Sequence, residues 1–168
     1  MKNIIDDLLN LVIAQFRLSL DSPHGINHWK RVENIGVYLA RFTGADVVVV
    51  RHFAYLHDSQ RISNDADIQH GVRAKAYVAN LISQGALSLS RTQERLLQLA
   101  CETHNTSHAS PDQTVATCLD ADRLDLWRLG IQPSEKLLFT EVGKKISKNK
   151  TLYDQVIRFS PVYAYKKI

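Results

Sequence analysis

The chain has 168 residues, of which 45% are hydrophobic and 23% charged, and its formal net charge is +4. These values predict one soluble globular domain with room for a sizeable core. They exclude a membrane-spanning protein, because no apolar run approaches the roughly 18 residues that a span requires. Asp6 and Asp7 stand where a signal peptide needs its apolar region, and Cys101 and Cys118 form no CxxC pair. We therefore expect a cytoplasmic protein with two buried thiols.

Helical periodicity dominates the sequence from its start. Apolar residues in 4–20 recur three or four positions apart, as they do along one face of a helix. The same spacing predicts further helices, which in chain order cover 27–42, 47–57, 68–84, 91–104, 113–129 and 152–159, with another opening at Ser134. The run of four valines at 47–50 is the only stretch typical of a strand, and it lies inside a helical pattern. The sequence therefore predicts an all-α fold, a single compact bundle of about seven helices spanning 1–168.

Capping residues mark several of these helix ends. Asp46 and Ser90 are expected N-caps, and Asp67 is expected to begin the helix over 68–84. Gly85 and Gly130 are expected to close helices at their C-termini.

The positive charge is concentrated near the C-terminus. Between residues 141 and 168, seven Lys and Arg residues stand against Glu141 and Asp154. A basic segment can contact nucleic acid or an anionic ligand. Because no nucleic-acid-binding motif accompanies the charge, we interpret the segment as a solvated surface and expect no nucleic-acid partner.

Most of the histidines lie at predicted helix ends or in loops, where ligand pockets of helical proteins form. They are His24, His28, His57, His70, His104 and His108. His52 is interpreted as a packing or surface residue. His57 is followed directly by Asp58 at the end of an apolar helix, and imidazole with carboxylate suits Fe, Mn, Zn, Ni or Co. An isolated His-Asp dipeptide occurs often by chance, so its meaning depends on the residues around it.

Three further stretches accompany this dyad: "HWKRV" from His28, "DIQHGVRA" after the polar loop, and "LDADRLD" around Asp122. The ordered set of His28, His57-Asp58 and Asp122 resembles the HD superfamily of metal-dependent phosphohydrolases. In that pattern a histidine, an HD dyad and a distal aspartate lie on separate helices. The resemblance covers residues 20–130, and 131–168 lie outside it as a basic helical tail of the same domain.

The resemblance implies an HD domain in which a first metal is held by His28, His57, Asp58 and Asp122. Such a set leaves positions open for water and substrate. Some HD proteins hold a second metal bridged by the dyad aspartate, and His70 and His104 stand where those proteins place further ligands. The alternative is that these two histidines donate hydrogen bonds to a phosphate beside a single metal. Neither the number of ions nor their identity, with Mg²⁺ a further candidate, follows from the sequence.

The expected substrate is a phosphorylated small molecule, a phosphomonoester or phosphodiester and by hypothesis a nucleotide, attacked by a metal-activated water. Asp58, His24 and Arg61 are the expected catalytic residues, with His24 donating a proton to the leaving group. Arg61 and Arg73, together with His70 and His104, are the expected substrate contacts, because guanidinium groups bind phosphate in bidentate fashion.

Two more arginines are assigned supporting roles. Arg123 is expected to pair with Asp120 or Asp125. Arg31 is expected to orient a metal-binding carboxylate.

Two other functions are compatible with the same residues. One is an HD-fold di-iron oxygenase, which needs the second metal site. The other is a non-catalytic module that senses a nucleotide. The presence of all four ligands of the first metal favours an enzyme, while the substrate and the oligomeric state do not follow from the sequence.

Overall fold

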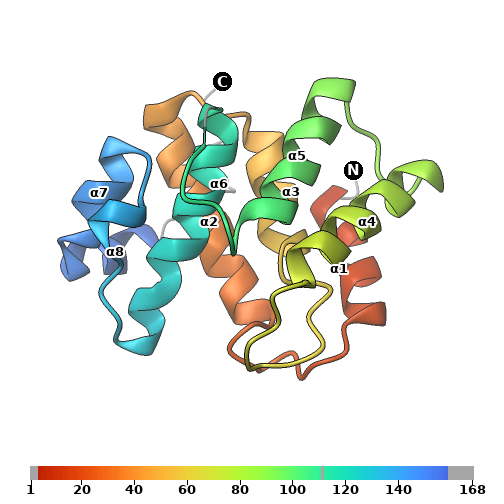
Figure 1. Ribbon diagram of the computed structural model, residues 1–168, viewed down its shortest axis with the longest axis horizontal. Helices are drawn as coiled ribbons and strands as arrows, with labels where there is room; N and C mark the ends of the chain where they lie inside the picture. The colour runs from red at the N-terminus through yellow and green to blue at the C-terminus, as the bar shows by residue number, and fades with distance from the viewer. Residues whose placement is uncertain (1–3, 111, 159–168) are drawn as a thin grey trace.

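The computed structural model describes residues 4–110 and 112–158, and over these residues it is all-α with no strand (Figure 1). The described residues form eight α-helices and two short 3-10 helices, which confirms the predicted fold class. The α-helices are α1 (Ile4–Gln15), α2 (Ile26–Thr43), α3 (Val47–Leu56), α4 (His70–Ser83), α5 (Arg91–Thr103), α6 (Gln113–Leu124), α7 (Glu141–Ser147) and α8 (Lys150–Val156). The 3-10 helices are η1 (Asp125–Leu129) and η2 (Glu135–Leu137).

One continuous hydrophobic core joins these helices. α2 packs against both α3 and α6, and α5 packs against α3 and α4. The short helices α7 and α8 lie beside α6 and α2 at one side of the bundle, and α4 lies at the other (Figure 1). Trp29, Phe53, Leu97 and Leu119, each from a different helix, are fully buried in this core. The apolar faces predicted from periodicity therefore meet in the interior.

Most of the predicted helix ends are found where the sequence places them. Asp46 caps α3, because its carboxylate accepts from the backbone N–H groups of Val48 and Val49. Ser90 caps α5 in a capping box with Gln93. All four valines lie in α3, so the strand-like composition of this run is overridden by the helix cap and by the burial of Val49 and Val50.

α4 begins at His70, later than predicted. The Asp67 carboxylate does not cap this helix, because it accepts instead from the backbone N–H of Ile62 and from Arg73. The backbone carbonyl of Asp67 accepts from the backbone N–H of His70. The helix end predicted at Gly85 is correct, since this residue takes the left-handed backbone conformation, with φ of 69°, just after α4.

The C-terminal part departs further from prediction. Ser134 opens only the short η2, because the chain must then extend so that the N–H groups of Phe139 and Thr140 donate to the buried Asp120 carboxylate. The α-helix that follows is α7, which Thr140 caps. The last helix, α8, begins at Lys150 rather than 152, and the residues predicted for it beyond 158 lie outside the described range.

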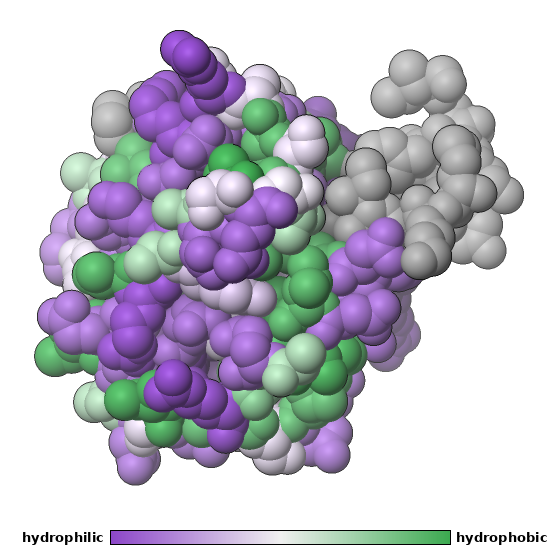
Figure 2. Space-filling view, turned by 90° about the vertical axis from the view of Figure 1, so that its right-hand side faces the viewer, coloured by the Kyte–Doolittle hydropathy of each residue, from purple (hydrophilic) through white to green (hydrophobic). Residues whose placement is uncertain are grey.

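The two cysteines agree with expectation. Cys101 and Cys118 are free and fully buried, and burial raises the pKa of both thiols. Among the described helices, none combines the length and the apolarity needed to cross a bilayer. On the face at the right of Figure 1, hydrophilic and hydrophobic side chains are interspersed, as on ordinary globular proteins (Figure 2).

Candidate metal centre

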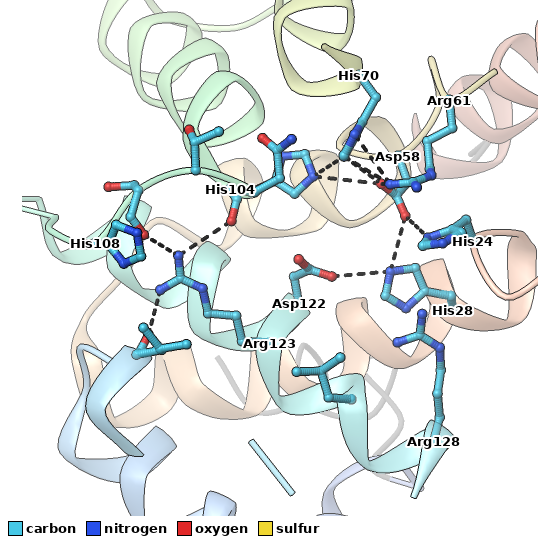
Figure 3. Close-up of a pocket in the computed structure, with 15 residues that line it drawn as sticks. His24, His28, Asp58, Arg61, His70, His104, His108, Asp122, Arg123 and Arg128 are labelled. Atoms are coloured by element: carbon cyan, nitrogen blue, oxygen red, sulfur yellow. Dashed lines mark hydrogen bonds and ion pairs between the residues drawn. The ribbon is translucent and has the colours of Figure 1, made fainter. Parts of the chain in front are cut away.

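Six histidine and aspartate side chains converge from five helix ends. Figure 3, in which His57 is not labelled, shows Asp58 joined by dashed lines to His28, His70 and His104. The cluster consists of His28 near the start of α2, His57 and Asp58 after α3, His70 at the start of α4, His104 after α5 and Asp122 near the end of α6. Five of the six are buried, and the Asp122 side chain is 22% exposed. These are the residues that the resemblance nominated as ligands, and the fold brings them together.

The rings of His57 and His104 are held in one orientation by their own helices. Nδ1 of His57 lies 3.0 Å from the carbonyl oxygen of Phe53, and Nδ1 of His104 lies 2.7 Å from that of Cys101. A backbone carbonyl only accepts hydrogen bonds, so the proton of each neutral ring sits on Nδ1. The Nε2 atom is then left with a lone pair that points into the cluster, as in a metal-binding histidine.

The first group of donors surrounds the facing Nε2 atoms of His28 and His57, which lie 3.1 Å apart. Asp58 Oδ2 is 3.6 Å from the His28 nitrogen and 3.8 Å from the His57 nitrogen. Asp122 Oδ1 is 3.3 Å and 3.6 Å from the same two atoms. Two imidazoles and two carboxylates around one point form a donor set that fits a divalent transition metal.

The second group lies on the other side of Asp58. Its Oδ1 atom is 3.1 Å from Nε2 of His70 and 3.7 Å from Nε2 of His104. The two histidine nitrogens are 2.7 Å apart. Because the two oxygens of Asp58 face different histidine pairs, this carboxylate has the arrangement of a bridge between two ions.

The electrostatics of the cluster favour positive charge. Burial acts to lower the pKa of His28, but hydrogen bonds to Asp122 and Asp125 and the charges of Asp122 and Asp58 raise it to about 9. Burial likewise acts to raise the pKa of Asp58 and is the largest single influence on it. The charge of His57 and hydrogen bonds from His104, His24 and His70 together outweigh burial and hold the pKa of Asp58 well below its usual range. A cluster that keeps its carboxylates ionised while buried is suited to a cation.

A cavity of about 360 Å³ opens onto Asp58 and Asp122. His24 reaches it from the loop before α2, and its Nδ1 lies 2.8 Å from Asp58 Oδ2. Arg61 lines the cavity beside Asp58, with Nη1 3.6 Å from Oδ1. The carbonyl oxygens of Ser63 and Asp65 accept from the Arg61 guanidinium and hold it in place.

Comparison with known proteins adds one finding on the fold. No protein-family model and no curated protein matches the sequence. The structure matches the crystal structure of a predicted HD superfamily hydrolase from an uncultured Thermotogales bacterium, with a TM-score of 0.67 and 24% sequence identity. The match covers 96% of this chain and 91% of that one.

The chain has an HD-domain-like fold. This confirms, for the fold, the resemblance inferred from the ordered motifs. The match covers more of the chain than residues 20–130, over which the motifs were found.

Arg73, predicted to contact substrate, does not line the cavity of this HD-like domain. Its guanidinium is bound by both oxygens of Asp67, at 2.6 and 2.7 Å, and by the carbonyl oxygen of Gln60. Arg73 therefore holds the loop between α3 and α4 against α4, and we do not retain it as a substrate contact.

Arg123 was expected to pair with Asp120 or Asp125, and the hydrogen bonds show another arrangement. It donates to the carbonyl oxygens of Ser107 and Leu137 and lies over the Phe139 ring, 5.0 Å from its centroid. Asp120 is occupied by backbone donors of the segment before α7. Arg123 thus fastens two loops at the edge of the cavity.

The structure also places three residues to which the sequence analysis assigned little or no role. His108 lines the cavity from the segment that follows α5, which ends at Thr103. His52 is buried, and its Nδ1 donates to the carbonyl oxygen of Val48. Asp125 was predicted only as an alternative partner of Arg123, yet it is fully buried and its Oδ2 lies 2.7 Å from Nδ1 of His28.

Proposed function

We propose that this chain is a metal-dependent phosphohydrolase that cleaves a phosphomonoester or phosphodiester, with nucleotides as the first substrates to test. The observation that carries the proposal is the position of Asp58, whose two oxygens face two separate pairs of histidines. The HD-like fold and the cavity beside this carboxylate support it.

The donors fit one ion held by His28, His57, Asp58 and Asp122, and a second held by Asp58, His70 and His104. Neutral imidazoles with carboxylates suit Mn, Fe, Co, Ni or Zn, and Mg²⁺ less well. When bound, such metals lower the pKa of a coordinated water toward neutrality and offset negative charge on phosphate oxygens.

The cavity residues would bind the phosphate and assist the departure of the leaving group. Arg61 is buried and already oriented by loop carbonyls, so its remaining donors can meet a phosphate oxygen with little reorganisation. His24 is bonded to Asp58 through Nδ1, which orients the ring and leaves Nε2 available to donate a proton to the leaving oxygen.

The rest of the substrate would lie along the outer part of the cavity. Leu126 and Leu137 give this wall an apolar surface, and Arg123 and Arg128 add positive charge. The volume of about 360 Å³ is at the low end for small-molecule sites, so a mononucleotide or smaller compound is the expected size.

The test combines metal analysis with hydrolysis assays on a panel of phosphomonoesters and phosphodiesters. We expect bound transition metal and phosphate release in the wild type, and loss of both in Asp58→Asn. Asp154→Asn is the matched control, because Asp154 is a surface carboxylate paired with Lys150 and distant from the cluster in sequence. An Asp58→Asn protein as active as Asp154→Asn would show that the hydrolysis does not belong to this site.

The pair of histidine groups that share one carboxylate also supports a second candidate, a di-iron oxygenase. Both iron sites would then be needed for reaction with O₂. Iron content with substrate-dependent O₂ consumption would favour this function. Phosphate release with Mn²⁺, Co²⁺ or Ni²⁺ in the absence of O₂ would contradict it.

A further inference from the structure

We propose that Asp125 is the positioning residue for His28 and that Tyr153, from the last helix, holds Asp125 in place. The helix α8 would thereby control how tightly the first metal binds. This inference rests on the proposed metal site and adds to it a dependence on α8.

Asp125 is saturated with donors although it is fully buried. Its Oδ2 atom is 2.7 Å from Nδ1 of His28 and 3.3 Å from Nη1 of Arg128. Its Oδ1 atom accepts from Nε of Arg31 at 2.8 Å and from the hydroxyl of Tyr153 at 2.7 Å. Four donors from α2, η1 and α8 thus fix the carboxylate in one orientation.

Tyr153 joins this network from a distant part of the chain. It lies on α8, is 2% exposed and donates its hydroxyl proton to a residue 28 positions earlier. Without that hydroxyl, one lone pair of a fully buried carboxylate would lose its partner, which is costly in an apolar surrounding. The bond therefore couples the placement of α8 to that of Asp125.

The effect on His28 follows from the chemistry of imidazole ligands. A carboxylate that accepts from Nδ1–H fixes the tautomer and the ring orientation and makes Nε2 a stronger donor. In the cluster His28 has such a carboxylate, whereas His57, His70 and His104 each direct Nδ1 at a backbone carbonyl. Substitution of Asp125 or Tyr153 should therefore weaken the binding of the first metal and leave the binding of the second unchanged.

The chain contains a matched control for this arrangement. Tyr55 donates to Glu33 at 2.5 Å, and Arg51 donates to the same carboxylate at 2.6 Å. This is again a buried tyrosine hydroxyl and an arginine Nε on one carboxylate, with no histidine of the cluster bonded to it in these contacts. Tyr55→Phe therefore repeats the chemical change of Tyr153→Phe, including its cost in stability, away from His28.

The experiment measures the affinity for Co²⁺ by chelator competition and the absorption of bound Co²⁺ in the visible range. We compare the wild type with Tyr153→Phe, Tyr55→Phe and Asp125→Asn. Each protein is also measured in a His104→Ala background, in which only the first metal site remains intact. We expect about tenfold weaker binding at the first site for Tyr153→Phe and about a hundredfold for Asp125→Asn, with an altered Co²⁺ spectrum. Tyr55→Phe should bind as the wild type does.

The outcomes separate this inference from the function on which it rests. If Tyr153→Phe is folded and binds Co²⁺ at the first site as tightly as Tyr55→Phe, the positioning role is wrong while the metal site stands. If the wild type itself binds no Co²⁺ and no other divalent metal, the metal site is wrong and this inference with it. Thermal unfolding of each variant establishes that the comparison is made on folded protein.

Discussion

Nε2 of His70 and Nε2 of His104 lie 2.7 Å apart. The Nδ1 atom of each ring faces a backbone carbonyl, that of Asp67 at 2.5 Å and that of Cys101 at 2.7 Å. With both protons on Nδ1, the two Nε2 atoms direct lone pairs at each other. Such a contact is favourable only when a proton or a metal ion lies between the nitrogens, and with Asp58 beside them it predicts a cation site.

The second site should therefore depend on His104. We expect His104→Ala to lower the metal content from two ions per chain to one, because the ions are held by separate histidine pairs. Elemental analysis of the purified protein measures this number. The control is His108→Ala, which changes a histidine of the same cavity that stands outside both groups. Two ions retained in His104→Ala, or one lost in His108→Ala, would contradict the assignment.

The close contact between α4 and α5 should matter for the same site. A Cβ atom at Gly71 would lie 2.7 Å from the carbonyl oxygen of Cys101 and 2.9 Å from that of Glu102, both in the backbone of α5. Gly71→Ala should push the helices apart, separate His70 from His104, and lower the free energy of unfolding by about 1–3 kcal/mol. Urea denaturation and metal analysis measure the two effects.

Gly143→Ala is a control for the steric part of that effect. Its Cβ atom would lie 2.6 Å from Asp120 Oδ2 and 2.8 Å from Thr140 Oγ1, at the contact between α6 and α7. We expect lower stability with the metal content unchanged. Equal metal content in the two variants would mean that the α4–α5 contact does not set the distance between the histidines.

The role of His24 as a proton donor predicts a dependence on the leaving group. Phenolate is a poor leaving group and gains from protonation, whereas 4-nitrophenolate leaves readily as an anion. His24→Asn should lower kcat for phenyl phosphate by about a hundredfold and for 4-nitrophenyl phosphate by much less. Equal losses for the two substrates would show that His24 binds or positions the phosphate and does not transfer the proton.

His52 should make the fold sensitive to acid. Burial lowers its pKa below 6.5 and the charge of Arg51 adds to this, while the carbonyl of Val48 acts in the opposite direction. The unfolded chain therefore takes up a proton more readily than the folded chain, so the free energy of unfolding falls as the pH drops below about 6.5. The loss is at most about 1.4 kcal/mol per pH unit from this one group.

His52→Leu should make that decline shallower between about pH 7 and pH 5. The Nε2 atom of His52 has no hydrogen-bond partner among the described residues, so an apolar side chain loses only the bond from Nδ1. Chemical denaturation across this range, with a chelator present, measures the slope. Parallel curves for variant and wild type would exclude His52 as the source of the pH dependence.

Local pattern was sufficient to predict much of the fold. The apolar spacing that buries Trp29 and Phe53 and the caps at Asp46 and Ser90 are short-range signals, and the helices that depend on them are present. The start of α4 was misplaced because the Asp67 side chain binds Arg73, six residues away, and the N–H of Ile62. A capping residue with such a competing partner looks the same in sequence as one without it.

The sequence was a better guide to which residues form the candidate site than to how those residues are arranged. The ordered motifs nominated the six clustered residues, and their roles stay predictions. Asp125 and Tyr153 could not be found in this way, because their connection to His28 joins segments that are up to 125 positions apart in the chain. Spacing on one helix, which relates Asp125 to Asp122, says nothing about which side chain of another helix lies opposite.

The directions of the helices around the cluster have a consequence of their own. α3, α5 and α6 end there, and α2 and α4 begin there. A helix carries about half a negative elementary charge at its C-terminus and the opposite charge at its N-terminus. Carbonyl oxygens at the C-terminal ends of α3 and α5 lie against Nδ1 of His57 and His104, so their partial negative charge acts on these rings. The peptide dipoles thus favour a cation beside these rings and an anion at the starts of α2 and α4, and this preference resides in the backbone, where no side-chain substitution removes it.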